Sequence, residues 1–118
     1  MKTVSVFIPS ANHTFIYRIG ENARDNFAVI DSADSSLDIW FHASEESSCH
    51  VVCLVPNPMD KKVRRHVIKQ GALLCKINTP KLRAIKNAEI IYTEIGNVKK
   101  TQVDGQVVIE GECKKVSI

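Results

Sequence analysis

Two neighbouring strands are predicted by the stretch LDIWFHASEESSCHVVCLV, residues 37–55. In its first part, Leu37–Ala43, side chains alternate between the two faces of a strand, so Trp40 and Phe41 must point to opposite sides. The polar loop Ser44–Ser48 leads into a second apolar run, Cys49–Val55. Because a short polar loop separates these runs, we expect a hairpin in the middle of a sheet, with a buried tryptophan.

The chain before this stretch is predicted to form another hairpin and a helix. Alternating apolar residues indicate strands at Thr3–Ile8 and Thr14–Ile19, joined by a turn. From Asn22 to Ala33 the apolar spacing is helical, and Asn22 is a suitable N-cap. The residues expected on the buried face of this helix are Ala23, Phe27 and Ile30.

A second helix is predicted from Lys61 to Lys76, capped by Asp60. Helical spacing gives it an apolar face made of Val63, Val67, Gly71 and Leu74. Another face carries the cations Lys62, Arg65, Lys69 and Lys76. We therefore expect an amphipathic helix that packs on the sheet and presents a basic stripe.

The last strands are expected at Ala88–Ile95, Gly105–Ile109 and Cys113–Ile118, as a β-meander. The order of elements favours an α+β fold, with a largely antiparallel sheet of about six or seven strands packed with two helices. A chain of 118 residues with ordinary globular composition is expected to form one domain, residues 1–118.

Charge is distributed unevenly along the chain. Residues 1–60 carry three basic and eight acidic residues, a balance of −5, so the total of +3 leaves +8 for the remainder. Between Lys61 and Lys86 there are nine basic residues and no acidic one. Solubilising surfaces normally mix both signs. This segment therefore indicates a surface that faces a polyanion.

We expect that polyanion to be a nucleic acid, RNA in the first place or DNA, because Lys and Arg bind phosphates through counterion release. A surface of this size would engage about four to six phosphates. The residues predicted to contact nucleic acid are Lys61, Lys62, Arg64, Arg65, Lys69, Lys76, Lys99 and Lys100, with Lys81, Arg83 and Lys86 as further loop cations. The first alternative is an adaptor domain that binds protein partners.

A small polar cluster is predicted on the central hairpin, where His42 and His50 share a sheet face near Trp40 and Asp38. With Ser47 or Ser48 as nucleophile, such a cluster would be typical of a hydrolase. No nucleophile elbow or oxyanion-forming glycine turn accompanies it, so we favour structural histidines and expect no catalytic residue. A small His-dependent hydrolase is the weaker alternative.

Neither a metal nor a cofactor is expected. On a strand, Cys49 and Cys53 lie roughly 13 Å apart and His50 points to the other face, so the three cannot share a zinc ion. No apolar run approaches the roughly 18 residues of a membrane span, and the N-terminus resembles no signal peptide. We therefore expect a cytoplasmic protein without a membrane partner, whose four cysteines are reduced.

The motifs Asp38-Ile39-Trp40-Phe41-His42 and Ser48-Cys49-His50-Val51 resemble the signature of the NFACT-R domain family. The later segments Ile91–Thr93 and Asn97–Thr101 resemble its YT and lysine-bearing segments, and Gly20 and Asn26 fit its glycine and helix-start asparagine. The family-motif residues present here are Asp38, Trp40, His42, Ser48, His50, Tyr92, Lys99 and Lys100.

Within that family the chain looks most similar to the short eukaryotic branch typified by coiled-coil domain-containing protein twenty-five, without its coiled-coil extension. The resemblance implies a noncatalytic RNA-binding module linked to translation and ribosome-associated quality control, with tRNA or rRNA as partner. The long relatives carry further domains, so their activities on stalled ribosomes do not carry over.

Overall fold

The computed structural model describes residues 1–118. Its helices are α1 (Ala23–Asp31) and α2 (Lys61–Ile77). Its strands are β1 (Lys2–Ile8), β2 (His13–Ile19), β3 (Ile39–Ala43), β4 (Val51–Cys53), β5 (Glu89–Glu94), β6 (Val98–Lys100), β7 (Val107–Ile109) and β8 (Lys114–Ser117). Short 3-10 turns lie at Pro9–Ala11, Pro80–Leu82 and Ile95–Asn97. Neither helix combines the length and the apolar composition that a bilayer span requires.

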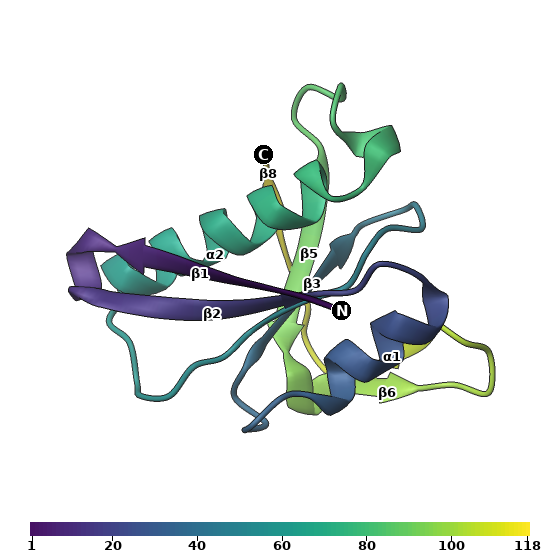
Figure 1. The fold of residues 1–118 in the computed structure, drawn as a ribbon, viewed down its shortest axis with the longest axis horizontal. Helices are drawn as coiled ribbons and strands as arrows, with labels where there is room; N and C mark the ends of the chain where they lie inside the picture. The colour runs from purple at the N-terminus through teal and green to yellow at the C-terminus, as the bar shows by residue number, and fades with distance from the viewer.

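Six strands form an antiparallel sheet in the order β1-β2-β4-β3-β5-β8, and β6 pairs with β7 in a separate two-stranded sheet. The predicted N-terminal hairpin is confirmed, with Lys2 opposite Ile19 and Ile8 opposite His13. The predicted central hairpin is confirmed as well, because β3 and β4 pair in the middle of the sheet. The fold is therefore α+β, as the sequence predicts (Figure 1).

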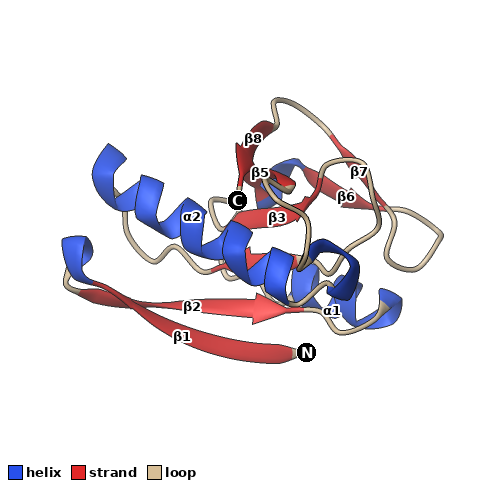
Figure 2. Ribbon diagram, turned by 90° about the horizontal axis from the view of Figure 1, so that it is seen from above, coloured by secondary structure: helices blue, strands red, loops and turns tan.

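The two helices cover opposite faces of the sheet. Alternation along β3 sends Ile39 and Phe41 toward α2, whereas Trp40 packs with Val29 of α1. Figure 1 shows α2 above β2 and α1 below it. Figure 2 shows β1 and β2 along one side of α2 and β3, β5 and β8 along its other side, so the sheet twists around this helix. The small β6–β7 sheet lies with α1 on the Trp40 face.

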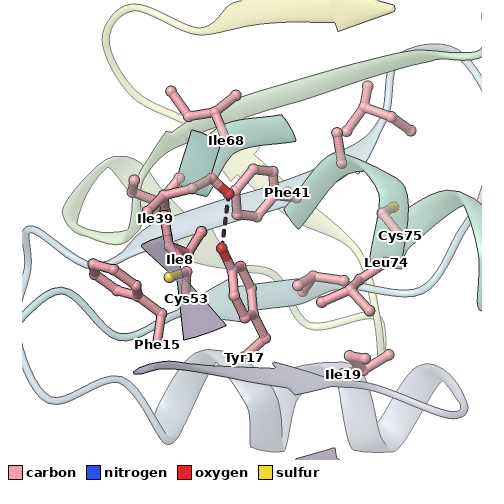
Figure 3. Packing of buried hydrophobic residues seen from close by; sticks show 14 of the residues in the cluster. Ile8, Phe15, Tyr17, Ile19, Ile39, Phe41, Cys53, Ile68, Leu74 and Cys75 are labelled. Atoms are coloured by element: carbon pink, nitrogen blue, oxygen red, sulfur yellow. Dashed lines mark hydrogen bonds between the residues drawn. The ribbon is translucent and has the colours of Figure 1, made fainter. Parts of the chain in front are cut away.

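The larger core lies between α2 and the sheet (Figure 3). Tyr17 is fully buried there, and its hydroxyl donates a hydrogen bond to the backbone carbonyl of Val67 at 2.9 Å. Gly71 leaves room for the Phe41 ring, which a Cβ at this position would overlap. The predicted apolar face of the helix is confirmed by the burial of Val63, Val67, Gly71 and Leu74.

The predicted buried face of α1 is wrong by about one position. Asn22 caps the helix as expected, and its side chain accepts the backbone N–H of Asp25 at 2.9 Å. The buried residues, however, are Asn26 and Val29, while Ala23 is exposed. Asn26 is held inside because its Oδ1 accepts the backbone N–H of His50 at 3.1 Å, a polar contact that apolar periodicity does not reveal.

The predicted C-terminal meander is also wrong. β5 pairs with β3 and β8, whereas the run that ends at Ile109 pairs with β6 instead. After β5 the chain turns at Ile95–Asn97 and crosses to the other face of the sheet, where Val98 packs against Trp40. Leu37, expected on the apolar face of β3, lies before the strand and is 57% exposed.

Candidate nucleic-acid interface

The cations of α2 lie on the sides of the helix that face away from the sheet. The helix begins after Asp60, whose carboxylate accepts the backbone N–H of Val63 at 2.9 Å. Because this capping fixes the phase of the helix, its apolar stripe faces the core and its basic stripe faces outward. Four cations are exposed and together are called here the basic face of α2: Lys61, Lys62, Arg65 and Lys69. Arg64 and Lys76 are half-buried beside it.

No acidic side chain forms an ion pair with this face. The three ion pairs of the molecule join the N-terminus to Asp25, Lys100 to Asp31 and Lys115 to Glu89. Hence none of the nine cations between residues 61 and 86 forms an ion pair with an acidic side chain. Three of them donate to oxygens outside acidic side chains: Lys76 to the backbone oxygen of Ile118, Lys81 to Ser47 Oγ and Arg83 to the Ile77 carbonyl. The charged ends on the basic face of α2 are free for an external ligand.

The position of these cations on the helix is itself unfavourable. The amino end of a helix carries partial positive charge, so cations there cost about 0.3–1 kcal/mol each at low salt. The N-cap Asp60 is the one acidic residue at this end, because the first turn of α2 contains none, whereas Lys61, Lys62, Arg64 and Arg65 all lie in the first two turns. An anion bound at this end would reduce the repulsion among these cations and would also interact favourably with the positive end of the helix dipole.

The predicted site residues do not all come together. Lys99 and Lys100 lie on β6, on the sheet face opposite α2. Lys99 Nζ donates to the Gly96 carbonyl at 3.1 Å. Lys100 Nζ pairs with Asp31 at 2.7 Å and lies 5.6 Å from the centre of the Phe27 ring. A single flat ligand therefore cannot contact this lysine pair and the basic face of α2 together.

Trp40, His42 and His50 form the predicted cluster on the central hairpin. The His42 ring stacks on Trp40 at 5.6 Å between centroids, and the two histidine rings meet edge to face at 4.8 Å. The indole N–H of Trp40 donates to His50 Nδ1 at 3.1 Å. Burial, followed by the charge of His42, lowers the pKa of His50 to about 4. Burial also lowers the pKa of His42, so both rings are neutral at physiological pH.

Asp38 does not belong to this cluster, contrary to the sequence-based expectation. Its carboxylate is 1% exposed and accepts three backbone N–H groups, from Asp34 at 2.8 Å, Ser35 at 3.1 Å and Val55 at 2.8 Å. It fixes the two loops that flank β3 and β4 at one end of the hairpin. The hydrolase alternative requires a carboxylate that orients a histidine, and this arrangement does not provide one.

The remaining motif residues also have structural partners. Ser48 Oγ accepts the backbone N–H of Ala43 at 2.9 Å and donates to the Cys49 carbonyl at 3.0 Å, which closes the loop between β3 and β4. The Tyr92 ring packs on Phe41 with 6.3 Å between centroids. These motif residues thus build the hairpin, and His42, Ser48 and Tyr92 are its half-buried members.

A polar groove of about 600 Å³ lies beside His42. It is lined by residues from the start of α1, the loop before β4, the end of α2 and the turn at Gly105, among them His42, Ser48, Cys49, Thr79 and Lys81. Sequence reasoning missed Thr79, whose hydroxyl accepts the Cys49 N–H at 3.2 Å and donates to the Cys75 carbonyl at 2.9 Å. No group of three metal-ligating side chains gathers here or elsewhere.

Comparison with known families matches residues 3–115 to the model described as the NFACT protein RNA binding domain. The chain belongs to this family. Its predicted family membership is therefore confirmed, and the motif residues Asp38, Trp40 and His50 of this NFACT-R domain hold the central hairpin.

A solved structure has the same fold: the C-terminal part of the fibronectin/fibrinogen-binding protein from Streptococcus suis. It is 21% identical in sequence, with a TM-score of 0.77, over 100% of the present chain. The chain spans 45% of that protein's resolved length. No curated protein matched the sequence.

Proposed function

We propose that this NFACT-R domain is a noncatalytic RNA-binding module whose contact surface is the basic face of α2. The observation that carries the proposal is the run of nine cations from Lys61 to Lys86, none of which forms an ion pair with an acidic side chain. The family description supports RNA as the nucleic acid.

The dimensions of the basic face fit a phosphate backbone. Lys62 and Lys69 are seven residues apart, and a helix rises about 1.5 Å per residue, so their backbones are separated by about 10 Å. Arg65 lies between them on the same side, and Lys76 extends the line to about 20 Å. Such a row bridges several successive phosphates, which agrees with an estimate of about four to six contacts.

Recognition on this surface depends on phosphates and shape. Most of the large aromatic side chains that would stack on bases are used in the cores, since Trp40, Phe41 and Tyr17 are at most 1% exposed. Phe7, which is 56% exposed, lies on the edge strand β1. Lys and Arg on an exposed helix provide affinity that is independent of sequence. We therefore propose structured RNA, such as tRNA or rRNA, as the partner. A role in translation or ribosome-associated quality control, in the cytoplasm, completes the proposal and is supported by the family resemblance.

A charge-reversal pair tests the surface. The variant Arg65→Glu/Lys69→Glu should lose retention of tRNA and duplex RNA in a gel-shift assay, with a melting temperature close to that of the wild type, because both side chains are exposed. The matched control Arg24→Glu/Lys99→Glu makes the same change of charge on the other side of the sheet, on α1 and β6. Loss of binding in the control, or retention in the first variant, would place the site elsewhere.

A protein-binding adaptor is the competing function, and one observation favours it. Leu73 and Ile77 are 37% and 45% exposed on the outer side of α2, next to the cations. A protein partner held by these apolar side chains would bind with little dependence on salt, whereas phosphate contacts weaken steeply as salt rises. Leu73→Ser should leave RNA retention unchanged.

A further inference from the structure

Two cysteines that are distant in sequence lie side by side next to the polar groove. Cys49 precedes β4, and Cys75 lies in the last turns of α2. The Sγ atom of each residue is 3.5 Å from the backbone carbonyl oxygen of the other. Because each thiol reaches the backbone of its partner, the two side chains occupy the same small space, and both are free thiols in the structure.

Neighbouring hydroxyl groups surround this pair. Thr79 Oγ1 lies 3.4 Å from Cys49 Sγ, within reach for an O–H···S hydrogen bond. Ser48 Oγ lies 3.7 Å from Cys75 Sγ. A thiolate on Cys49 would therefore accept a hydrogen bond from the Cys75 thiol. The single proton of the Thr79 hydroxyl can be donated either to this thiolate or to the Cys75 carbonyl. The hydrogen bond from Cys75 lowers the pKa of Cys49, and the same contact raises the pKa of Cys75.

The two thiols differ in access. Cys49 is half-buried and lines the polar groove, whereas Cys75 is completely buried behind it. The other cysteines lack this arrangement. Cys53 is buried, and burial raises its pKa to about 12, while Cys113 contacts backbone carbonyls only, and burial raises its pKa as well. Since the thiolate is the reactive form, the environment distinguishes Cys49 from the rest.

We propose that Cys49 is a site of oxidation by peroxides and that Cys75 resolves the product to a disulfide. In the first step the Cys49 thiolate attacks one oxygen of hydrogen peroxide, the O–O bond breaks, and the departing hydroxide takes a proton to become water, which leaves a sulfenic acid. In the second step the Cys75 sulfur attacks Cys49 Sγ, the S–O bond breaks, and hydroxide leaves with the Cys75 proton as water. Two thiols are oxidised by two electrons, and one peroxide is reduced to two waters.

The inference is independent of RNA binding. The disulfide would join the segment before β4 to the end of α2 and close a loop between residues 26 positions apart. A cross-link of this kind constrains the unfolded chain. The oxidised protein should therefore melt at a higher temperature than the reduced protein, and a thiol reductant should reverse the shift.

Peptide mapping of the full chain tests the proposal. The reduced protein is treated with one equivalent of hydrogen peroxide, free thiols are alkylated, and each cysteine is followed by mass spectrometry. We expect a peptide pair linked through Cys49 and Cys75, and loss of the free Cys49 thiol about ten times faster than that of Cys113. Oxidation of Cys113 at the same rate as Cys49, or absence of the linked pair, would overturn the proposal.

Variants separate the two steps. Cys75→Ala should stop at the sulfenic acid on Cys49, which dimedone traps, and Cys49→Ala should form no intramolecular disulfide. Cys113→Ala, the matched control, should form the disulfide as the wild type does. Dimedone adducts on Cys113 in place of Cys49 would contradict the assignment. If a variant fails to fold, the wild-type peptide map still decides whether Cys49 and Cys75 form the disulfide.

Discussion

The buried histidine of the motif makes stability depend on pH in a defined window. His50 is 1% exposed and accepts the Trp40 indole N–H, an arrangement that requires an unprotonated Nδ1. Its pKa is about 4 in the folded chain and about 6.5 in the unfolded chain. Below about pH 6.5 the unfolded chain therefore gains a proton that the folded chain does not bind, so the free energy of unfolding falls as pH falls toward 4.

The magnitude follows from the two pKa values. A difference of about 2.5 units corresponds to about 3 kcal/mol when fully expressed, of which about 2 kcal/mol is lost between roughly pH 7.5 and pH 5. His42, whose pKa burial also lowers, acts in the same direction. The carboxyl groups whose pKa values are lowered, Asp25 and Glu89, titrate below this window. The Cys49 thiol, whose pKa is lowered to about 7, also titrates in this window and acts in the same direction, so the comparison with a His50 variant is what isolates the histidine.

Urea denaturation followed by the fluorescence of Trp40, the single tryptophan, measures this effect. The wild type should lose about 2 kcal/mol over the window, and His50→Gln should lose much less, because an amide oxygen accepts the indole N–H and does not titrate. His13→Gln, a change at an exposed histidine, is the control and should behave as the wild type does. A flat wild-type profile, or an unchanged slope in His50→Gln, would refute the structural role assigned to His50.

Two further changes test the scaffold. Gly71→Ala should destabilise the protein by about 1–2 kcal/mol because the new Cβ would overlap the buried Phe41 ring, although alanine normally favours a helix. A double-mutant cycle with Phe41→Leu tests this contact. A smaller cost of Gly71→Ala in the Phe41→Leu background would support it, and additive costs would contradict it. Asp38→Asn should lower the free energy of unfolding, measured by chemical denaturation, by about 2–4 kcal/mol. The reason is that one amide oxygen cannot replace a carboxylate that accepts three backbone N–H groups. A free energy of unfolding equal to that of the wild type would show that these bonds contribute nothing.

The elements fixed by local patterns could be predicted from the sequence. The helix from Lys61 follows directly from its capping aspartate and its apolar spacing, and the observed end at Ile77 differs by one residue from the prediction. The central hairpin follows from two apolar runs around a polar loop. The proximity of His42, His50 and Trp40 follows from alternation on paired strands.

Features that depend on distant contacts could not be predicted. Nothing local to β7 shows that it pairs with β6 rather than β8, because partner choice depends on the crossing after β5. The polar interior position of Asn26 depends on a backbone N–H from another strand. For the same reason, the sequence could not show that Lys99 lies on the face opposite α2.

The salt dependence of RNA binding tests the central claim most directly. If the basic face of α2, together with Arg64 and Lys76 beside it, neutralises about four to six phosphates, the logarithm of the association constant for duplex RNA should fall linearly with the logarithm of salt concentration, with a slope of about −4 to −5. Arg65→Gln/Lys69→Gln should reduce the magnitude of that slope by about 2, and Arg24→Gln on the other side of the sheet should leave it unchanged. A slope near zero, or one that the double variant does not alter, would contradict the claim that α2 binds RNA.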